Sequence, residues 1–277
     1  MQVAQQQIPS LSINNFTIPA LGLGVLKAQD GNEVEQAVAA ALKAGYRLID
    51  TASVYGNESG VGQAITNSSV NRNDIFLTTK VWNRDQGYDQ TLRAFDESLE
   101  RLKTDYVDLY LIHWPVAGKY VDTWRALERI HQEGRAKAIG VSNFQAHHLD
   151  HLLQTAKVQP VVNQIELHPH LQQVELRKYA AEHNILLEAW RPIMMGEVLQ
   201  VPELLVIGRK YGKSAVQVTL RWLYQLDVIS IPKSVNPERI AANADIFDFE
   251  LSTEEMAIIA RLDQGRRLGP DPDNFNF

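Results

Sequence analysis

Four residues with acid–base chemistry lie within or after short apolar segments of the chain. Asp50, Lys80 and His113 each belong to, or directly follow, a run rich in Val, Ile and Leu, and Tyr55 lies just beyond Asp50. Charged groups in a low-dielectric interior are costly unless they are paired. If the fold brings these four side chains together, they form a set suited to reducing a carbonyl group.

The chemistry of such a set depends on the proton of Tyr55. A tyrosine has an ordinary pKa of about 10, which is high for a proton donor near neutral pH. An ammonium group such as that of Lys80 favours the phenolate and lowers this pKa, and Asp50 would keep Lys80 charged. His113 would hydrogen-bond the carbonyl oxygen. The spacing alone also fits a structural ion pair at a strand end beside a core tyrosine and a core histidine.

Eight short apolar runs could position these residues. They cover residues 21–24, 46–50, 75–81, 107–114, 136–142, 161–166, 185–189 and 228–232. Segments with helical spacing lie between them, such as the one containing Val34, Val38 and Ala41. Parallel strands need such crossovers, and eight strands close a barrel, so the sequence predicts an α/β fold, a (β/α)8 TIM barrel. Active sites of these barrels lie at the carboxyl ends of the strands.

Additional elements are predicted at both ends of the barrel sequence. Residues 11–18 form two alternating runs around Asn14 and Asn15, which predicts an N-terminal β-hairpin. Residues 252–262 predict an extra C-terminal helix, because Ser252 stands three residues before a glutamate in a capping box. The tail that follows is rich in Pro, Gly, Asp and Asn and is expected to be a loop crossing one end of the barrel.

Length and composition limit the class of protein. The 277 residues fit one barrel of about 250, so residues 1–277 are expected to form a single domain. The chain has no cysteine, which excludes disulfides and thiolate metal ligands. The net charge of −6, with no basic cluster, argues against nucleic-acid binding.

The segment 1–9 is polar and glutamine-rich and does not resemble a signal peptide. No apolar stretch approaches the roughly 18 residues of a membrane span. These features predict a cytoplasmic protein that has no membrane partner.

Several segments, in unbroken order, resemble those of the aldo-keto reductase family. They are residues 45–52, 55–58, 108–115, 140–144, 162–169 and 231–235, followed by Arg239 and Asn243. The resemblance extends from about residue 9 to the end of the chain. It is greatest to bacterial members such as 2,5-diketogluconate, glyoxal and methylglyoxal reductases. One such motif would be weak evidence, whereas several in order at strand ends are specific.

The resemblance implies an NADPH-dependent oxidoreductase in which Tyr55 is the proton donor, tuned by Lys80 and Asp50, and His113 orients the substrate. It implies no metal, and it favours a monomer. The residues that it assigns to the cofactor are Ser142, Asn143, Gln164, Trp190, Lys233, Ser234, Val235, Arg239 and Asn243. The first three would bind the nicotinamide carboxamide, and Trp190 would stack on the ring. Lys233, Ser234 and Arg239 would hold the adenosine 2′-phosphate, and Val235 and Asn243 belong to the same cofactor clamp. A phosphate dianion suits lysine and bidentate arginine.

The chain departs from the family pattern near the expected substrate. Arg191 stands where many members have serine, so it is expected to contact the cofactor phosphates, although it could instead face solvent or substrate. Leu26 stands where members with large aromatic pockets carry tryptophan, while Trp82 and Trp114 remain as apolar walls. With a short tail from Gly265, these features predict an open mouth for small aldehydes, α-dicarbonyls such as methylglyoxal, or keto sugar acids.

Other polar residues have structural interpretations. Glu166 and His168 are expected to be structural, because the family pattern assigns them no chemical step. His147 and His151 have the spacing of a metal pair but no evident third ligand, so they are expected to lie on a solvated face. Gly24 belongs to an incomplete dinucleotide fingerprint and is expected to allow a close backbone approach instead.

Two other functions remain open at this stage. A nicotinamide-binding sensor or channel-associated subunit would share the fold but would not need Tyr55 beside Lys80. A barrel enzyme acting on phosphorylated sugars would use Lys233 and Ser234 for the sugar phosphate. The fold alone does not distinguish these functions.

Overall fold

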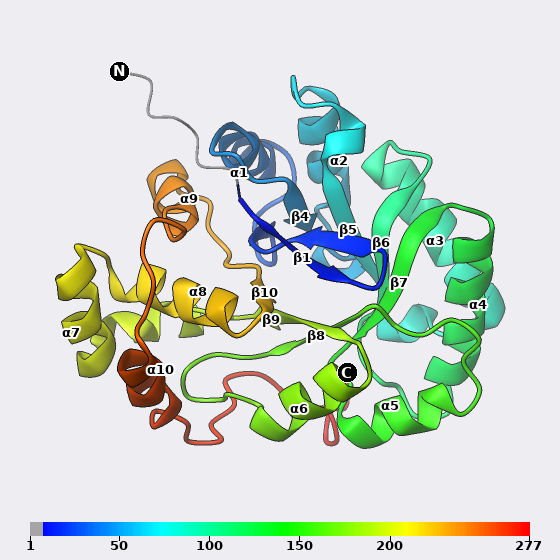
Figure 1. Ribbon diagram of the computed structural model, residues 1–277. Helices are drawn as coiled ribbons and strands as arrows, with labels where there is room; N and C mark the ends of the chain where they lie inside the picture. The colour runs from blue at the N-terminus through cyan, green and yellow to red at the C-terminus, as the bar shows by residue number, and fades with distance from the viewer. Residues whose placement is uncertain (1–7) are drawn as a thin grey trace.

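Eight parallel strands form the centre of the molecule in a computed structural model, which describes residues 8–277 (Figure 1). They are β3 (Gly22–Gly24), β4 (Leu48–Asp50), β5 (Phe76–Val81), β6 (Val107–Ile112), β7 (Ala136–Ser142), β8 (Val162–Glu166), β9 (Leu186–Trp190) and β10 (Val228–Ser230). Each strand pairs with the next along the chain, and β10 meets β3 through Ser230 N–H, which donates to Ala20 O at 3.1 Å. The predicted (β/α)8 barrel is confirmed.

Helices surround these strands (Figure 1). They are α1 (Asn32–Lys43), α2 (Glu58–Thr66), α3 (Tyr88–Leu102), α4 (Tyr120–Gln132), α5 (Ala146–Leu153), α6 (Val174–Glu182), α7 (Pro202–Tyr211), α8 (Ala215–Gln225), α9 (Pro237–Ala244) and α10 (Thr253–Ala260). Single-turn or short 3-10 segments are η1 (Ser53–Tyr55), η2 (Arg72–Asp74), η3 (Asn83–Asp85) and η4 (Met194–Gln200). The predicted extra C-terminal helix is α10, and its Ser252–Glu255 capping box is present.

The predicted N-terminal hairpin consists of β1 (Ser10–Ile13) and β2 (Phe16–Pro19). Its turn contains Asn14 with φ of 50°, a left-handed conformation that asparagine tolerates. The hairpin, blue in Figure 1, lies across one end of the barrel. Ile18 is fully buried there in the same apolar cluster as Leu48 and Leu109. The hairpin therefore closes the end at which the strands begin.

Side chains alternate between two separate cores. Leu186 on β9 belongs to the cluster inside the barrel, whereas Leu187 and Ala189 belong to the cluster between strands and helices. Alternation in a strand then places Glu188 inside the barrel as well. The same argument applies to Asp50, two residues beyond the inward-facing Leu48. The lumen is thus apolar near the hairpin and polar toward the carboxyl ends of the strands.

Two of the apolar runs predicted as strands extend beyond the strands in the structure. The run 107–114 ends as a strand at Ile112, so His113 is the first residue beyond β6. The run 228–232 ends at Ser230, two residues before a proline, which has no N–H for a sheet ladder. No described helix has the length and apolarity that crossing a membrane requires. The prediction that the chain lacks a signal peptide concerns a start, residues 1–7, that lies outside the described residues.

The barrel seam requires a glycine on β3. A Cβ at Gly24 would lie 2.8 Å from the carbonyl oxygen of Ile231, a backbone atom that cannot move aside as a side chain could. The expected close backbone approach at Gly24 is confirmed. We expect Gly24→Ala to lower the free energy of unfolding by about 1–3 kcal/mol, the usual cost of overpacking. Denaturant unfolding would measure the change, with Gln36→Ala at an exposed position of α1 as the control. A Gly24→Ala protein as stable as the wild type would contradict this account of the seam.

Candidate active site

Asp50, Lys80 and Tyr55 meet at the carboxyl ends of the strands. The Lys80 ammonium donates to both carboxylate oxygens of Asp50, at 2.7 and 2.8 Å, and to the carbonyl of Thr51 at 2.9 Å. It lies 3.4 Å from the Tyr55 hydroxyl. The lysine and aspartate side chains are almost completely buried. The structure therefore brings three of the four predicted residues into one hydrogen-bonded group.

His113 completes this group from the first position after β6. Its ring lies edge-on to Tyr55 with centroids 5.7 Å apart, and edge-on to Trp82 at 5.0 Å. Burial, together with the charge of Lys80, holds the pKa of His113 well below its ordinary value. The imidazole is therefore neutral near pH 7 and has one ring N–H to donate.

Burial dominates the electrostatics of the group. It lowers the pKa of Lys80, but the charge of Asp50 and the proximity of Tyr55 reverse the effect and leave this pKa raised. Burial also raises the pKa of Asp50, against the influence of Lys80 and Gln164. The pKa of Tyr55 is likewise raised by burial, although Lys80 opposes the change. Lys80 acts in the expected direction, but the desolvation of the phenolate exceeds its influence, so the expected lowering of the Tyr55 pKa is not found.

A polar anchor holds the loop that carries Tyr55. Asn57 is fully buried, and its amide donates to the carbonyls of Val25 and Ala28 at 2.9 and 3.0 Å. Its side-chain oxygen accepts the Thr51 hydroxyl at 2.8 Å. These bonds tie the loop after β4 to the loop after β3. They explain how a residue outside the strands keeps a defined position over the mouth.

Residues predicted to bind the nicotinamide form a second hydrogen-bonded group. The Ser142 hydroxyl donates to Gln164 O at 2.8 Å, and the Gln164 amide donates to Asp50 at 2.8 Å. The Asn143 amide donates to His113 O at 2.9 Å, while its oxygen accepts the Trp190 indole N–H at 2.8 Å. The structure thus brings these four predicted residues together and joins them directly to the Asp50–Lys80 pair.

Arg191 is held against the C-terminal tail. Its guanidinium donates to Leu268 O and lies 5.3 Å from the centroid of the Trp190 ring. Its φ of 52° places the residue in the left-handed region, a strained conformation for arginine. The structure thus places the Arg191 side chain on the protein's own tail, a position that the sequence analysis did not predict.

Glu166 holds the same part of the tail. One carboxylate oxygen accepts the backbone N–H groups of Leu268 and Gly269, at 2.7 and 3.1 Å, and contacts His168 at 3.2 Å. A Cβ at Gly269 would lie 2.4 Å from the Trp190 ring. These contacts agree with the structural role expected of Glu166 and His168, and they place the tail directly against Trp190.

The end of the tail covers the predicted apolar walls. Phe277 stacks on Trp82 with centroids 5.8 Å apart, and Phe275 lies 5.1 Å from Trp114. The side chain of Leu26 is 42% exposed. The expected open mouth is therefore wrong in this structure, because two aromatic rings from the tail lie on the two tryptophans. The sequence analysis took the short tail from Gly265 as a sign of an open mouth, but the tail is long enough to reach both tryptophans.

The remaining residues predicted to bind the cofactor lie in the segment before α9 and within α9 itself. Lys233 and Arg239 are exposed, Ser234 and Val235 are half-buried, and Asn243 is buried. Pro237 is the first helical residue, as its position in the sequence suggests, and Asn236 caps the helix by accepting Arg239 N–H at 2.9 Å. Four of the five predicted residues therefore lie before or within the first turn of α9, whereas Asn243 lies in its last turn.

The histidines after β7 do not pair as their spacing suggests. His151 bonds through Nδ1 to the Tyr120 hydroxyl at 2.5 Å, away from His147. His147 and His148 instead approach Asp273, at 3.2 and 3.6 Å. The Nδ1 atom of His148 accepts the N–H of Gln145, so the proton of the neutral ring is on Nε2, facing the carboxylate. This geometry favours a hydrogen bond over a metal ligand.

One residue of the polar lumen was missed by the sequence analysis. Glu188 is fully buried, pairs with Gln164 in the β8–β9 register, and has no hydrogen-bond partner at either carboxylate oxygen. The available signal was an acidic residue inside the apolar run 185–189. It was overlooked because only residues at strand ends were considered.

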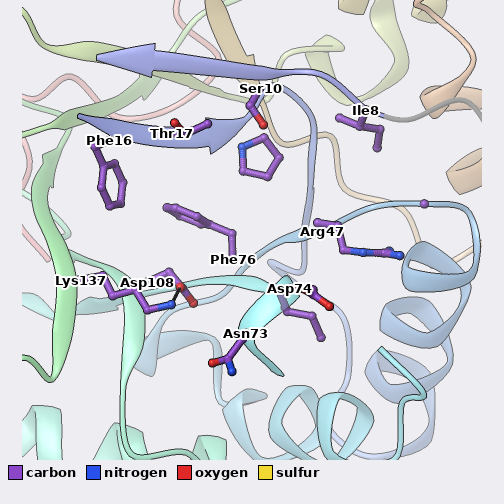
Figure 2. A pocket seen from close by; sticks show the side chains of 13 residues that line it. Ile8, Ser10, Phe16, Thr17, Arg47, Asn73, Asp74, Phe76, Asp108 and Lys137 are labelled. Carbon is purple, nitrogen blue, oxygen red and sulfur yellow. Dashed lines mark ion pairs between the residues drawn. The ribbon is translucent and has the colours of Figure 1, made fainter. Parts of the chain in front are cut away.

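A separate cavity of about 610 Å³ lies at the opposite end of the barrel, between the hairpin and the starts of the strands (Figure 2). Phe16 and Phe76 both line it and contact each other edge to face, with centroids 5.8 Å apart. Lys137 and Asp108 form an ion pair at its wall with a distance of 2.8 Å. The cavity contains none of the predicted site residues, so its size does not identify the active site.

Comparisons with known proteins show the family of this chain. The model of the Aldo/keto reductase family matches residues 20–264. A glyoxal reductase of Bacillus subtilis (strain 168) is 54% identical over 264 residues, covering 95% of this chain and 96% of that protein. The crystal structure of an aldo/keto reductase from Brucella melitensis has a TM-score of 0.90 at 51% identity, covering 93% of this chain and 100% of that one. A Bombyx mori aldo-keto reductase in complex with NADP has a TM-score of 0.90 at 38% identity, covering 97% of each chain. The chain therefore belongs to the aldo/keto reductase family.

Proposed function

We propose that this protein reduces aldehydes and ketones to alcohols with NADPH, and that Tyr55 supplies the proton. The observation that carries the proposal is the position of the Tyr55 hydroxyl, 3.4 Å from a buried ammonium that is itself held by Asp50. A binding protein has no need for this arrangement. In a proton donor it stabilises the phenolate that remains when the proton has left.

The protein's own groups have distinct tasks in this reaction. Tyr55 donates its proton to the carbonyl oxygen, and Lys80 stabilises the resulting phenolate. Asp50 keeps Lys80 charged and oriented through two hydrogen bonds. The neutral imidazole of His113 donates a hydrogen bond that orients the carbonyl. When bound, NADPH supplies the hydride, while the protein supplies position and charge.

The residues present fit this cofactor. Lys233 and Arg239 place two exposed cations at the capped start of α9, which suits a phosphate dianion. Ser142, Asn143 and Gln164 are oriented by the bonds described above and would hold the carboxamide. Their acceptor oxygens each have a second lone pair for this purpose. The half-buried Trp190 ring would stack on the nicotinamide, and the Bombyx mori relative was crystallised with NADP.

We assign the substrates to small aldehydes and α-dicarbonyls, with keto sugar acids such as 2,5-diketogluconate as a related group. The Bacillus subtilis relative is named a glyoxal reductase. Phe275 and Phe277 reduce the space beside Trp82 and Trp114, which disfavours bulky ketones. We further propose that residues 1–277 act as a single domain, as a cytoplasmic monomer without nucleic-acid or metal partners.

Replacing the proton donor tests the reaction. We expect Tyr55→Phe to lower kcat for methylglyoxal by about 10²–10⁴-fold, because the variant has no proton to donate. NADPH oxidation, followed by nicotinamide absorbance, would measure the rate. Cofactor fluorescence would show that NADPH still binds.

Tyr106→Phe is the matched control, because Tyr106 bonds to Asn73 at the other end of the barrel. Full activity in Tyr55→Phe would exclude Tyr55 as the donor. No turnover of any carbonyl by the wild type, with NADPH still bound, would favour a sensor. Absence of NADPH binding would favour an enzyme of phosphorylated sugars.

Replacing a cation at α9 tests the cofactor. A charge-assisted hydrogen bond contributes about 1.5–3 kcal/mol, so we expect Arg239→Ala to raise KM for NADPH about 10- to 100-fold. KM for NADH, which has no 2′-phosphate, should change little. Arg209→Ala on α7, also exposed, is the control. Equal effects on the two cofactors would show that Arg239 does not bind the 2′-phosphate.

A further inference from the structure

Glu188 lies inside the barrel among the groups that control Tyr55. It is on β9, faces the lumen with Leu186, and has no exposed surface. Its register neighbour on β8 is Gln164, whose amide donates to Asp50 rather than to Glu188. Its register neighbour on β10 is the apolar Ile229. Glu188 is therefore a second buried carboxyl group next to a single ammonium.

The two carboxyl groups do not share the ammonium equally. Asp50 accepts two hydrogen bonds from Lys80 and one from Gln164, whereas Glu188 accepts none within normal geometry. An ionised carboxylate without partners in a low-dielectric interior is strongly disfavoured, and such a group becomes neutral by binding a proton. The proton of the pair therefore belongs on Glu188.

We propose that Glu188 is a positioning residue of the reductase, which holds a proton inside the barrel at neutral pH and thereby leaves the charge of Lys80 available to Tyr55. This inference rests on the proposed function, since it concerns the efficiency of the same proton donor. It assigns Glu188 no contact with substrate or cofactor. Its effect is transmitted through Lys80 and Asp50.

The charges around Glu188 agree with this assignment. Burial, followed by the charge of Asp50, raises the pKa of Glu188 to about 8, against the charge of Lys80 and the smaller effect of the nearby Gln164 amide. That amide lies close to Glu188 but outside hydrogen-bond geometry, because it donates to Asp50. An ionised Glu188 would in turn raise the pKa of Tyr55 and of Lys80. Below about pH 8 Glu188 is protonated, and the buried cluster holds one carboxylate, that of Asp50, for one ammonium, that of Lys80. Above that pH the ionised Glu188 adds a second negative charge to the cluster, and Tyr55 becomes a weaker acid because this charge disfavours its phenolate.

Infrared spectroscopy tests the proton without any assay of activity. The wild type at pH 6.5 should show the C=O stretch of a buried protonated carboxylic acid, which disappears as the pH rises through about 8. Glu188→Gln should abolish this band. Glu188→Leu, which preserves the apolar bulk, should also abolish it and serves if the glutamine variant fails to fold.

Glu166→Gln is the matched control for the band. Glu166 is also a buried carboxylate, but its hydrogen bonds to His168 and to the backbone of Leu268 and Gly269 outweigh burial and lower its pKa. The protonated-acid band should therefore survive in Glu166→Gln. A wild type without such a band, or a band that Glu188→Gln leaves unchanged, would overturn the assignment of the proton.

The pH profile of reduction tests the influence on Tyr55. In the wild type, kcat/KM for methylglyoxal should fall as the pH rises through about 8, where Glu188 ionises. Glu188→Gln mimics the protonated form at every pH, so it should match the wild type at pH 6.5 and keep more activity at pH 9.5. A pKa change of one unit in Tyr55 corresponds to a difference of up to about tenfold between the two proteins.

The two readouts separate the possible failures. Superimposable pH profiles of active wild type and Glu188→Gln would refute the positioning role even if the infrared band is present. A wild type that reduces no carbonyl would refute the proposed function, while the band would still decide where the proton lies. A merely structural Glu188 would lower activity equally at every pH, and this result too would refute the proposal.

Discussion

The buried ammonium of Lys80 is the constraint on which the site depends. A charge inside a barrel is tolerated only with close partners, and Lys80 has three acceptor atoms within 2.9 Å. Those partners fix the orientation of Asp50, which in turn receives the amide of Gln164. The charge of Lys80 also acts on Tyr55, because it lies 3.4 Å from the hydroxyl and favours the phenolate. Burial keeps His113 neutral, and the charge of Lys80 adds to this effect because a second cation so close is disfavoured.

The lumen of the barrel has an apolar half and a polar half, and the polar half accommodates the buried charge of Lys80. Apolar side chains and the hairpin fill the end where the strands begin, and polar side chains gather at the other end. Every strand contributes inward-facing residues at similar heights, so Asp50, Gln164 and Glu188 become neighbours although they are far apart in the chain. Close packing at the seam, where Gly24 meets the backbone of Ile231, completes the ring that holds them together.

The C-terminal tail connects the two halves of the candidate site. Glu166 and Arg191 both hold the tail at Leu268, Glu166 by accepting its N–H and Arg191 by donating to its carbonyl. Beyond this point the tail carries Phe275 and Phe277 onto the tryptophans. Arg191, which the sequence suggested for the cofactor, thus helps to hold the tail that covers Trp82 and Trp114. The arginine that stands where many family members have serine therefore has a contact of its own within this chain, the carbonyl of Leu268.

The sequence by itself determined the barrel, the hairpin, the extra helix and the residues that meet at the mouth, because strand alternation, capping boxes and strand-end polar residues are local patterns. It predicted Tyr55, Lys80, Asp50 and His113 together, since residues at the carboxyl ends of parallel strands must share one edge. Only the tertiary structure decided the net direction of the Tyr55 pKa, which depends on burial, and the covering of Trp82 by a distant tail. It alone also revealed Glu188, because the register across β8 and β9 and the lack of a partner belong to no single segment of the chain.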